Sequence, residues 1–321
     1  MPMSADVSIP TIGEIGAAAE RIAGRAHRTP VLTCGALDEL AGARLFFKCE
    51  NLQKAGAFKF RGACNAVLSL ADDQAARGVV THSSGNHAAA LALAARLRGI
   101  PAHIVMPDNA PAAKRRAVEA YGGRITFCRP TLADRTAVAS RILDETGGVL
   151  VHPYDNPAVI AGQGTVALEL HEQAPGLDQI VAPVSGGGLI SGIALATAAV
   201  SPRTEIVGVE PELAADAQQS LQAGSLLPPQ IGDTIADGLR AALCERTFAV
   251  ISQHVREILT VTEAEIVAAM RLIWERVKLV VEPSSAVTLA AVLKEPTRFR
   301  GMRVGLVLSG GNVDLDRLPW S

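Results

Sequence analysis

The 321 residues carry 30 Lys and Arg against 32 Asp and Glu, and a formal charge of −2 offers no basic surface for nucleic acid or an anionic membrane. Hydrophobic residues make up 49% of the chain but aromatic residues only 3%, so the apolar content is aliphatic, as in helices packed on buried parallel strands. The length suffices for one large or two moderate domains. We therefore expect an α/β protein whose partner is a small molecule.

In the first half of the chain, short aliphatic runs alternate with helical stretches. The pattern predicts strands at 78–82, 102–106, 124–128 and 149–151. It predicts helices between them at 86–97, 112–121 and 132–146. Strands that alternate with helices of about 10 to 15 residues indicate βαβ units and parallel pairing.

The second half repeats this alternation. Strands are predicted at 179–184, 205–210 and 303–308, and helices at 190–200, 263–277 and 284–293. Residues 211–237 are richer in Gln, Pro and Gly and predict an irregular stretch. We expect a small domain of residues 68–155 inserted into a large domain made of residues 1–67 and 156–321.

Cysteine usage and hydropathy bear on the compartment. The cysteines are dispersed without a CxxC spacing, at Cys34, Cys49, Cys64, Cys128 and Cys244. An odd, scattered set is typical of reduced thiols rather than of a disulfide framework or a zinc site. No apolar run approaches the roughly 20 residues of a spanning helix, and the first residues lack a signal-peptide layout. We expect a cytoplasmic protein without a membrane partner.

Three glycine-rich segments, 83–87, 185–189 and 309–312, each follow a predicted strand. We expect each to open a helix and all three to meet at one sheet edge, where α/β proteins bind ligands. The run 185–188 leaves backbone N–H groups uncovered before a helix, which favours an anion such as phosphate. It matches neither a dinucleotide fingerprint nor a P-loop. A plain strand-to-helix turn is the alternative reading.

Lys59 lies between two phenylalanines in the run 54–62. Alone it would be a lysine whose stem covers apolar surface. Together with the three glycine-rich segments it supplies an amine for a Schiff base, two glycine-rich loops that can hold an anion, and a hydroxyl for a ring nitrogen. Pyridoxal phosphate needs each of these contacts.

Several motifs between about residue 22 and residue 315 resemble those of a known family. They are Phe46-Phe47-Lys48-Cys49-Glu50, Gly56-Ala57-Phe58-Lys59-Phe60-Arg61-Gly62-Ala63, Thr81-His82-Ser83-Ser84-Gly85-Asn86-His87, Ala161-Gly162-Gln163-Gly164-Thr165 and Leu308-Ser309-Gly310-Gly311-Asn312-Val313-Asp314. The chain resembles the fold-type II pyridoxal-phosphate enzymes, in the branch of the serine racemases and threonine (serine) dehydratases, and most of all the serine racemases. The resemblance implies a two-domain, tryptophan synthase β-like fold with open, mostly parallel sheets. We expect a homodimer.

The same resemblance assigns the cofactor to Phe58, Lys59, Asn86, Ser185, Gly186, Gly187, Gly188, Leu189, Glu282 and Ser309. Lys59 would carry the Schiff base and, once freed, remove a proton from Cα of the substrate. Phe58 would pack on the ring and Asn86 would bind its phenolic oxygen. The segment 185–189 would hold the phosphate, and Ser309 would face the pyridine nitrogen with Glu282 nearby.

The resemblance assigns the amino-acid substrate to Ser83, Ser84, Asn86, His87 and Arg135. Ser84 would be the second acid/base, on the face of Cα opposite Lys59. Its alternative role is to cap the helix that begins near Asn86. The sequence departs from the family pattern at Ser185, Ala88 and Ala241, and the last change leaves the preferred substrate open.

Glu210 and Asp216 end a predicted strand and begin the irregular stretch. Two such carboxylates can bind a hard cation through oxygen. The resemblance implies a site for Mg²⁺ or Ca²⁺ completed by the carbonyl of Ala214. A solvated surface loop is the alternative.

The predicted activity is a pyridoxal-phosphate-dependent ammonia-lyase that dehydrates L-serine or L-threonine to a 2-oxo acid and ammonia, with serine racemisation as a second activity. A threo-3-hydroxyaspartate dehydratase and a primarily racemising enzyme are alternatives within the family. A non-catalytic phosphate-binding α/β protein is the alternative from another class.

Overall fold

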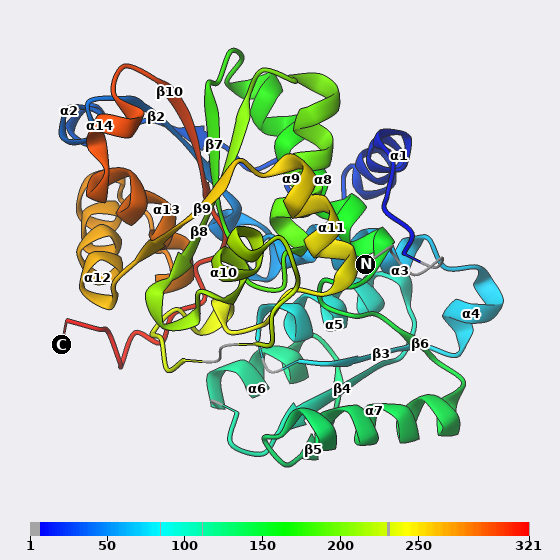
Figure 1. Cartoon of the computed structure of the whole chain (residues 1–321). Coiled ribbons are helices and arrows are strands. Elements are labelled where there is room, and N and C mark those ends of the chain that lie inside the picture. Colours follow the sequence, from blue (N-terminus) through cyan, green and yellow to red (C-terminus); the bar gives the residue numbers. More distant parts are fainter. Residues whose placement is uncertain (1–6, 84, 111, 230–231, 321) are drawn as a thin grey trace.

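The computed structural model describes residues 7–83, 85–110, 112–229 and 232–320, which form two sheets flanked by helices (Figure 1). The larger sheet has the strand order β1-β2-β10-β7-β8-β9 and the smaller one β5-β4-β3-β6. Across the described residues, every strand pairing is parallel except that of β1 with β2. The α/β fold class with mostly parallel sheets is confirmed.

The larger sheet draws its strands from both ends of the chain. They are β1 (Val31–Leu32), β2 (Arg44–Cys49), β7 (Gln179–Pro183), β8 (Glu205–Pro211), β9 (Glu257–Val261) and β10 (Arg303–Leu308). Alternate side chains of β7 enter two different cores, Ile180 on one face and Val181 on the other. A strand buried on both faces is apolar at successive positions, which explains the aliphatic runs in the sequence.

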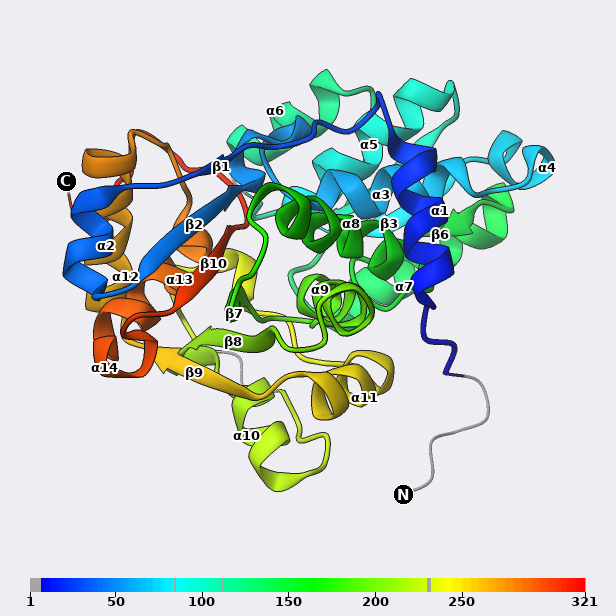
Figure 2. The same cartoon turned by 90° about the horizontal axis from the view of Figure 1, so that it is seen from above.

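Helices cover both faces of this sheet (Figure 2). One face carries α2 (Gly35–Ala41), α12 (Glu263–Leu272), α13 (Pro283–Lys294) and α14 (Pro296–Phe299). The other carries α1 (Ile12–Ile22), α8 (Pro157–Gln173), α9 (Gly188–Val200) and α11 (Glu245–His254).

The smaller sheet lies between residues 79 and 150. Its strands are β3 (Val79–His82), β4 (Ala102–Pro107), β5 (Arg124–Cys128) and β6 (Val149–Leu150). One face packs on α3 (Lys59–Leu68), α5 (Asn86–Arg98) and α6 (Ala112–Ala120), and the other on α7 (Leu132–Thr146). The short α4 (Asp72–Ala76) precedes β3. The expected domain limits at 67/68 and 155/156 stay a prediction.

Helix α3 joins the two halves, because it packs against both α5 and α8. Its contact with α8 depends on glycines: a Cβ on Gly162 would lie 2.6 Å from Cα of Gly62. The next contact along α8 is equally close, since a Cβ on Gly192 of α9 would lie 2.5 Å from the backbone nitrogen of Gly164. These glycines cost helix propensity but let three helix backbones approach one another.

Two expectations for secondary structure were wrong. The stretch 211–237, expected to be irregular, contains a short 3-10 turn at Glu212–Ala214 and the helix α10 (Asp216–Ala223). The helix expected at 263–277 is α-helical only as far as Leu272 and continues as a π-helical turn, Ile273–Val277. Within the described residues, no helix is both long and apolar enough to cross a membrane.

Candidate active site

The three glycine-rich segments meet, but at the facing edges of two sheets. Segment 83–87 follows β3 of the smaller sheet, whereas 185–189 and 309–312 follow β7 and β10 of the larger one. The Asn86 side chain connects segment 83–87 with segment 309–312: its Oδ1 accepts a hydrogen bond from Asn312 Nδ2 (2.9 Å), and its Nδ2 donates to Glu282 Oε1 (2.9 Å). The expectation of one shared edge was therefore wrong, and the site lies between the sheets.

The expectation that every segment opens a helix also fails for 309–312. The backbone there runs beside the residues before Lys59 instead: Phe58 N–H donates to Ser309 O (2.9 Å), and Gly311 N–H donates to Gly56 O (2.9 Å). These bonds place the Ser309 loop against the start of α3.

Lys59 is the first residue of α3 and its side chain is half-buried. Its Nζ donates to Pro153 O (2.9 Å) and lies 5.0 Å from the centroid of the Phe58 ring. Burial lowers the pKa of the amine from 10.5 to about 8. A much larger fraction of this lysine is therefore uncharged near neutral pH than of an exposed one, as a nucleophilic amine requires.

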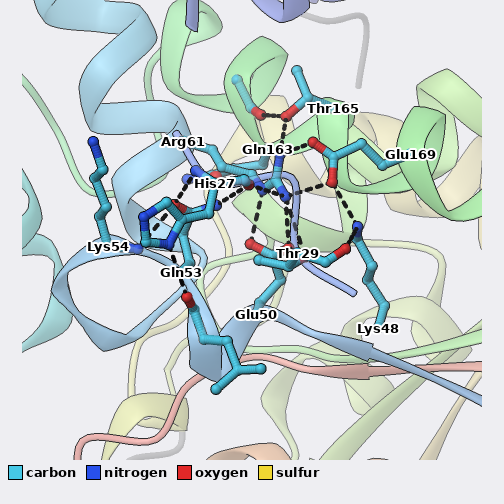
Figure 3. Close-up of polar contacts among 12 residues, drawn as sticks. His27, Thr29, Lys48, Glu50, Gln53, Lys54, Arg61, Gln163, Thr165 and Glu169 are labelled. Atoms are coloured by element: carbon cyan, nitrogen blue, oxygen red, sulfur yellow. Dashed lines mark hydrogen bonds and ion pairs between the residues drawn. The ribbon is translucent and has the colours of Figure 1, made fainter. Parts of the chain in front are cut away.

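Arg61 belongs to a largely buried cluster of four charges, which we call the ion quartet: Lys48, Glu50, Arg61 and Glu169 (Figure 3). Arg61, two residues after Lys59, donates from Nε to Glu50 Oε2 (2.8 Å) and from a terminal nitrogen to Glu169 Oε1 (2.7 Å). Lys48 Nζ donates to Glu169 Oε2 (2.6 Å). Two cations and two carboxylates thus tie β2, α3 and α8 together beside the candidate site.

The segment 185–189 has the geometry of an anion site. Gly187 has φ +82°, in the left-handed region, and α9 begins at the next residue. The first turn of a helix leaves N–H groups without intrahelical acceptors, and these favour an anion. Ser185 is fixed from the side, because its hydroxyl exchanges hydrogen bonds with the backbone of Ala241.

Ser309, the first residue of the segment 309–312, and Glu282, which contacts this segment, are both buried. The hydroxyl of Ser309 lies 3.2 Å from that of Ser285, and Glu282 N–H donates to Gly310 O (3.1 Å). Burial raises the pKa of the Glu282 carboxyl to about 8, with the charge of Asp237 acting in the same direction. Glu282 is therefore largely protonated at neutral pH.

The expected substrate residues lie around the end of β3. Ser83 Oγ accepts from Gly85 N–H (3.3 Å). His87 is 2% exposed, and its Nε2 donates to Val151 O (3.0 Å), which leaves Nδ1 as a buried acceptor without a partner among the described residues. Burial, followed by the charge of Lys59, lowers the pKa of His87 to about 3. Its ring is neutral at physiological pH.

Arg135 lies on α7, and its buried Nε lacks a hydrogen-bond partner in the part of the chain that the structure describes. Burial, followed by the charge of Arg135, lowers the pKa of His82 at the end of β3. Ser84, the expected second acid/base, lies outside the described residues.

Sequence reasoning missed His82, His152 and Tyr154. The His82 and His152 rings are edge to face with centroids 5.4 Å apart, and His152 meets Tyr154 in the same way at 4.6 Å. Burial lowers the pKa of His152 to about 4. The signal was available, since His82 ends one predicted strand and His152 directly follows another, at the edge where α/β sheets bind ligands.

The expected metal ligands lie at the end of β8: Glu210 is in the strand, Ala214 in the 3-10 turn and Asp216 at the start of α10. Both carboxylates are buried. Burial raises the pKa of Glu210 well above its ordinary value, and the charge of Asp216 adds to the rise. A search of the described residues finds no group of three or more His, Cys, Asp or Glu side chains placed to bind a metal.

Comparison with known proteins shows which family the chain belongs to. The family model "Pyridoxal-phosphate dependent enzyme" matches residues 22–310. The chain is 53% identical to the beta-hydroxyaspartate dehydratase of Paracoccus denitrificans over 98% of this chain and 99% of that one. It is 53% identical to the serine racemase of Arabidopsis thaliana over 93% of this chain and 92% of that one.

Among solved structures, maize serine racemase superposes with a TM-score of 0.94 at 49% identity, over 96% of this chain and 95% of that one. Because the family model and these relatives each span most of its length, the chain belongs to the pyridoxal-phosphate-dependent enzymes of fold type II.

Proposed function

We propose that this enzyme is an ammonia-lyase that eliminates water from β-hydroxy amino acids and releases a 2-oxo acid and ammonia. The observation that carries the proposal is the position of the Lys59 amine, whose pKa is lowered. Its Nζ donates to Pro153 O, next to the Tyr154 that contacts the glycine loop, and Phe58 N–H, one residue before Lys59, donates to Ser309 O. Relatives at about half identity that are named as a dehydratase and as serine racemases support the same chemistry.

The residues present fit pyridoxal phosphate. Segment 185–189, including Leu189 in the first turn of α9, would hold the phosphate at the helix N-terminus. Lys59 would supply the amine, with Phe58 against the ring. The buried hydroxyl of Ser309 would face the pyridine nitrogen, and Asn86, already held by Glu282, would bind the phenolic oxygen.

When bound, the cofactor supplies an electron sink for the negative charge that develops at Cα. Lys59 removes the Cα proton, because burial keeps its pKa near the working pH. Ser309 offers the ring nitrogen a neutral hydroxyl, which cannot hold a proton there as a carboxylate would. A neutral hydroxyl at this position therefore favours prompt loss of the β-hydroxyl group over a long-lived negative charge at Cα.

Serine racemisation is the proposed second activity, with Ser84 as the acid on the opposite face of Cα. Elimination from the L-isomer needs only the proton abstraction on the lysine side. Ser84→Ala should therefore lose L-to-D conversion far more than dehydration, and equal loss of both would indicate a capping or positional role.

3-Hydroxyaspartate is the alternative substrate, and one observation favours it. No carboxylate forms an ion pair with Arg135 among the described residues, although its Nε is buried. A substrate with a second carboxylate would supply the missing partner.

A panel of L- and D-serine, L-threonine and the 3-hydroxyaspartate isomers, assayed for 2-oxo acid release and by chiral chromatography, tests the proposal. Lys59→Ala is the control and should abolish turnover while leaving the fold intact. Turnover by this variant would contradict the role of Lys59. Absence of both turnover and the visible absorbance of the lysine-bound cofactor in the wild-type protein would favour the non-catalytic phosphate-binding alternative.

We also propose that Glu210, Asp216 and the Ala214 carbonyl bind Mg²⁺ or Ca²⁺. Two buried carboxylates lie close enough for one to raise the pKa of the other, and a hard cation would offset this repulsion. At a hundredfold excess over Kd, a ligand of the native state adds about 2.7 kcal/mol of stability. Chelation should lower Tm, Mg²⁺ should restore it, and Asp216→Ala should remove the response. An unchanged Tm after chelation would indicate a metal-free pair.

We propose finally that the enzyme works in the cytoplasm as a homodimer. All five cysteines are free, which suits a reducing compartment. Sedimentation of the holoenzyme tests the assembly state.

A further inference from the structure

The ring of Tyr154 lies directly against the glycine loop. A Cβ on Gly186 would be 2.4 Å from Cδ1 and 2.5 Å from Cε1 of Tyr154. A Cβ on Gly188 would be 2.9 Å from Cβ of the same tyrosine. Two of the three glycines are thus in contact with one side chain, which fills the space that their own side chains would take.

The third glycine, Gly187, contacts other residues. A Cβ on Gly187 would meet Thr247 Cβ at 2.7 Å and Leu243 Cδ2 at 2.8 Å. The loop is therefore held between Tyr154 on one side and, on the other, Thr247 in the first turn of α11 and Leu243, two residues before that helix. Such a loop keeps its N–H groups in one arrangement before an anion arrives, which lowers the cost of binding.

Tyr154 itself is fixed by its neighbours. Its ring meets the edge of His152 at 4.6 Å with an interplanar angle of 83°. Asp155 N–H donates to His152 Nδ1 (2.9 Å), which orients that imidazole, and the Asp155 carboxylate pairs with Arg246 of α11. On the other side, Pro153 O accepts from Lys59 Nζ. The segment 152–155 thus reaches from the Lys59 amine to the glycine loop.

We propose that Tyr154 is a positioning residue for the glycine loop: its ring holds Gly186, while its Cβ and backbone lie against Gly188, in the arrangement that binds the cofactor phosphate. The side-chain atoms in contact belong to the ring, at Gly186, and to Cβ, at Gly188, so the hydroxyl does not carry this role. The inference rests on membership of the pyridoxal-phosphate family and is independent of which amino acid the enzyme converts.

Equilibrium titration of the apoenzyme with pyridoxal phosphate and with pyridoxal, which lacks the phosphate, separates this role from general packing. Tyr154→Ala should raise Kd for pyridoxal phosphate by about tenfold or more and Kd for pyridoxal by less than about twofold. Tyr154→Phe keeps the ring and should bind both as the wild type does.

Tyr121→Ala is the matched control, because Tyr121 is the other tyrosine of the chain and packs in the cluster of the smaller sheet. It should lower Tm while leaving both Kd values unchanged. Equal weakening of the two ligands by Tyr154→Ala, or no weakening, would overturn the proposal.

A double-mutant cycle on the Tm of the apoenzyme provides a second test that needs no ligand. Gly186 has a backbone φ that alanine can adopt, and the three nearest obstacles to a Cβ there are all atoms of the Tyr154 ring. Gly186→Ala should lower Tm clearly in the wild-type background and much less in the Tyr154→Ala background. An equal drop in both backgrounds would show that the ring does not shape the loop.

Discussion

The hydroxyl of Ser185 holds the backbone of Ala241 in both directions, donating to its carbonyl oxygen (3.2 Å) and accepting from its N–H (3.0 Å). These two positions are 56 residues apart, and at both of them the resemblance in sequence implies a different residue. The serine at the start of the glycine loop therefore anchors the chain segment that leads to α11.

Ser185→Ala should consequently destabilise the protein by about 1–2 kcal/mol, since it removes two hydrogen bonds of about 1 kcal/mol each. Urea unfolding of the apoenzyme measures the change. Ser140→Ala, on the exposed face of α7, is the matched control and should shift stability by less than about 0.5 kcal/mol. If the two variants unfold alike, the hydroxyl of Ser185 does not hold this segment.

Removing one charge of the ion quartet should destabilise the protein more than Ser185→Ala does. Arg61→Met leaves Glu50 and Glu169 without their shared cation, and an uncompensated buried charge costs about 3–5 kcal/mol. Arg28→Met is the control: Arg28 pairs with Glu172 of the same helix α8 at 2.8 Å, but both side chains are more than half exposed. The control should cost less than about 1 kcal/mol. If Arg61→Met lowers the free energy of unfolding only slightly, water or a rearranged lysine replaces the guanidinium.

The sequence predicted the elements whose pattern is local. The strands and helices of the smaller sheet alternate with clear aliphatic runs, and their observed bounds differ from those expected by at most one residue. Helix α8 was not predicted, because Gly162 and Gly164 lower its helix propensity and their benefit lies in contacts with α3 and α9. Helix α10 is only eight residues long, so its stability comes from packing on β9 and α11.

The residues of the candidate site also fall into those that the sequence could predict and those that it could not. Lys59, the glycine loop and Ser309 could be proposed from residue type and position after strands. The pairing of Arg61 with Glu169 joins residues 108 apart, and the contact of Tyr154 with Gly186 depends on how two sheets face each other. No periodicity within a segment carries such information.

Glu282 predicts a pH dependence of stability. Its pKa is raised from 4.5 to about 8 in the folded enzyme, so the folded state binds a proton that the unfolded chain has lost. This contribution is fully present below about pH 4.5 and is lost as the pH rises through about 8. Glu282→Gln keeps an acceptor for Asn86 Nδ2 and cannot ionise.

The difference in unfolding free energy between Glu282→Gln and the wild type should therefore grow in favour of the variant between about pH 5 and pH 8. Urea unfolding of the two apoenzymes across this range measures it. Glu20→Gln, on the exposed face of α1, is the control for removing one carboxylate. A constant difference for Glu282→Gln would show that this carboxyl titrates alike in both states.

Lys59 predicts the pH dependence of cofactor attachment. Burial lowers the pKa of its amine from 10.5 to about 8, and only the uncharged amine attacks the aldehyde. The rate of attachment to the apoenzyme should therefore rise about tenfold per pH unit below 8 and level off above it. Stopped-flow absorbance measures the rate, and attachment to a simple alkylamine, which stays charged to higher pH, corrects for ionisation of the cofactor.

The lowered pKa of Lys59 also predicts how the stability of the apoenzyme changes with pH, and this can be measured without cofactor. The folded state loses its proton near pH 8 while the unfolded lysine keeps one up to about 10.5, so rising pH stabilises the apoenzyme between these values. Lys59→Met should remove that gain, and its unfolding free energy relative to the wild type should fall across this window. An attachment rate that still climbs steeply above pH 9, with no such difference in stability, would place the Lys59 amine in water rather than in the buried position that makes it a base.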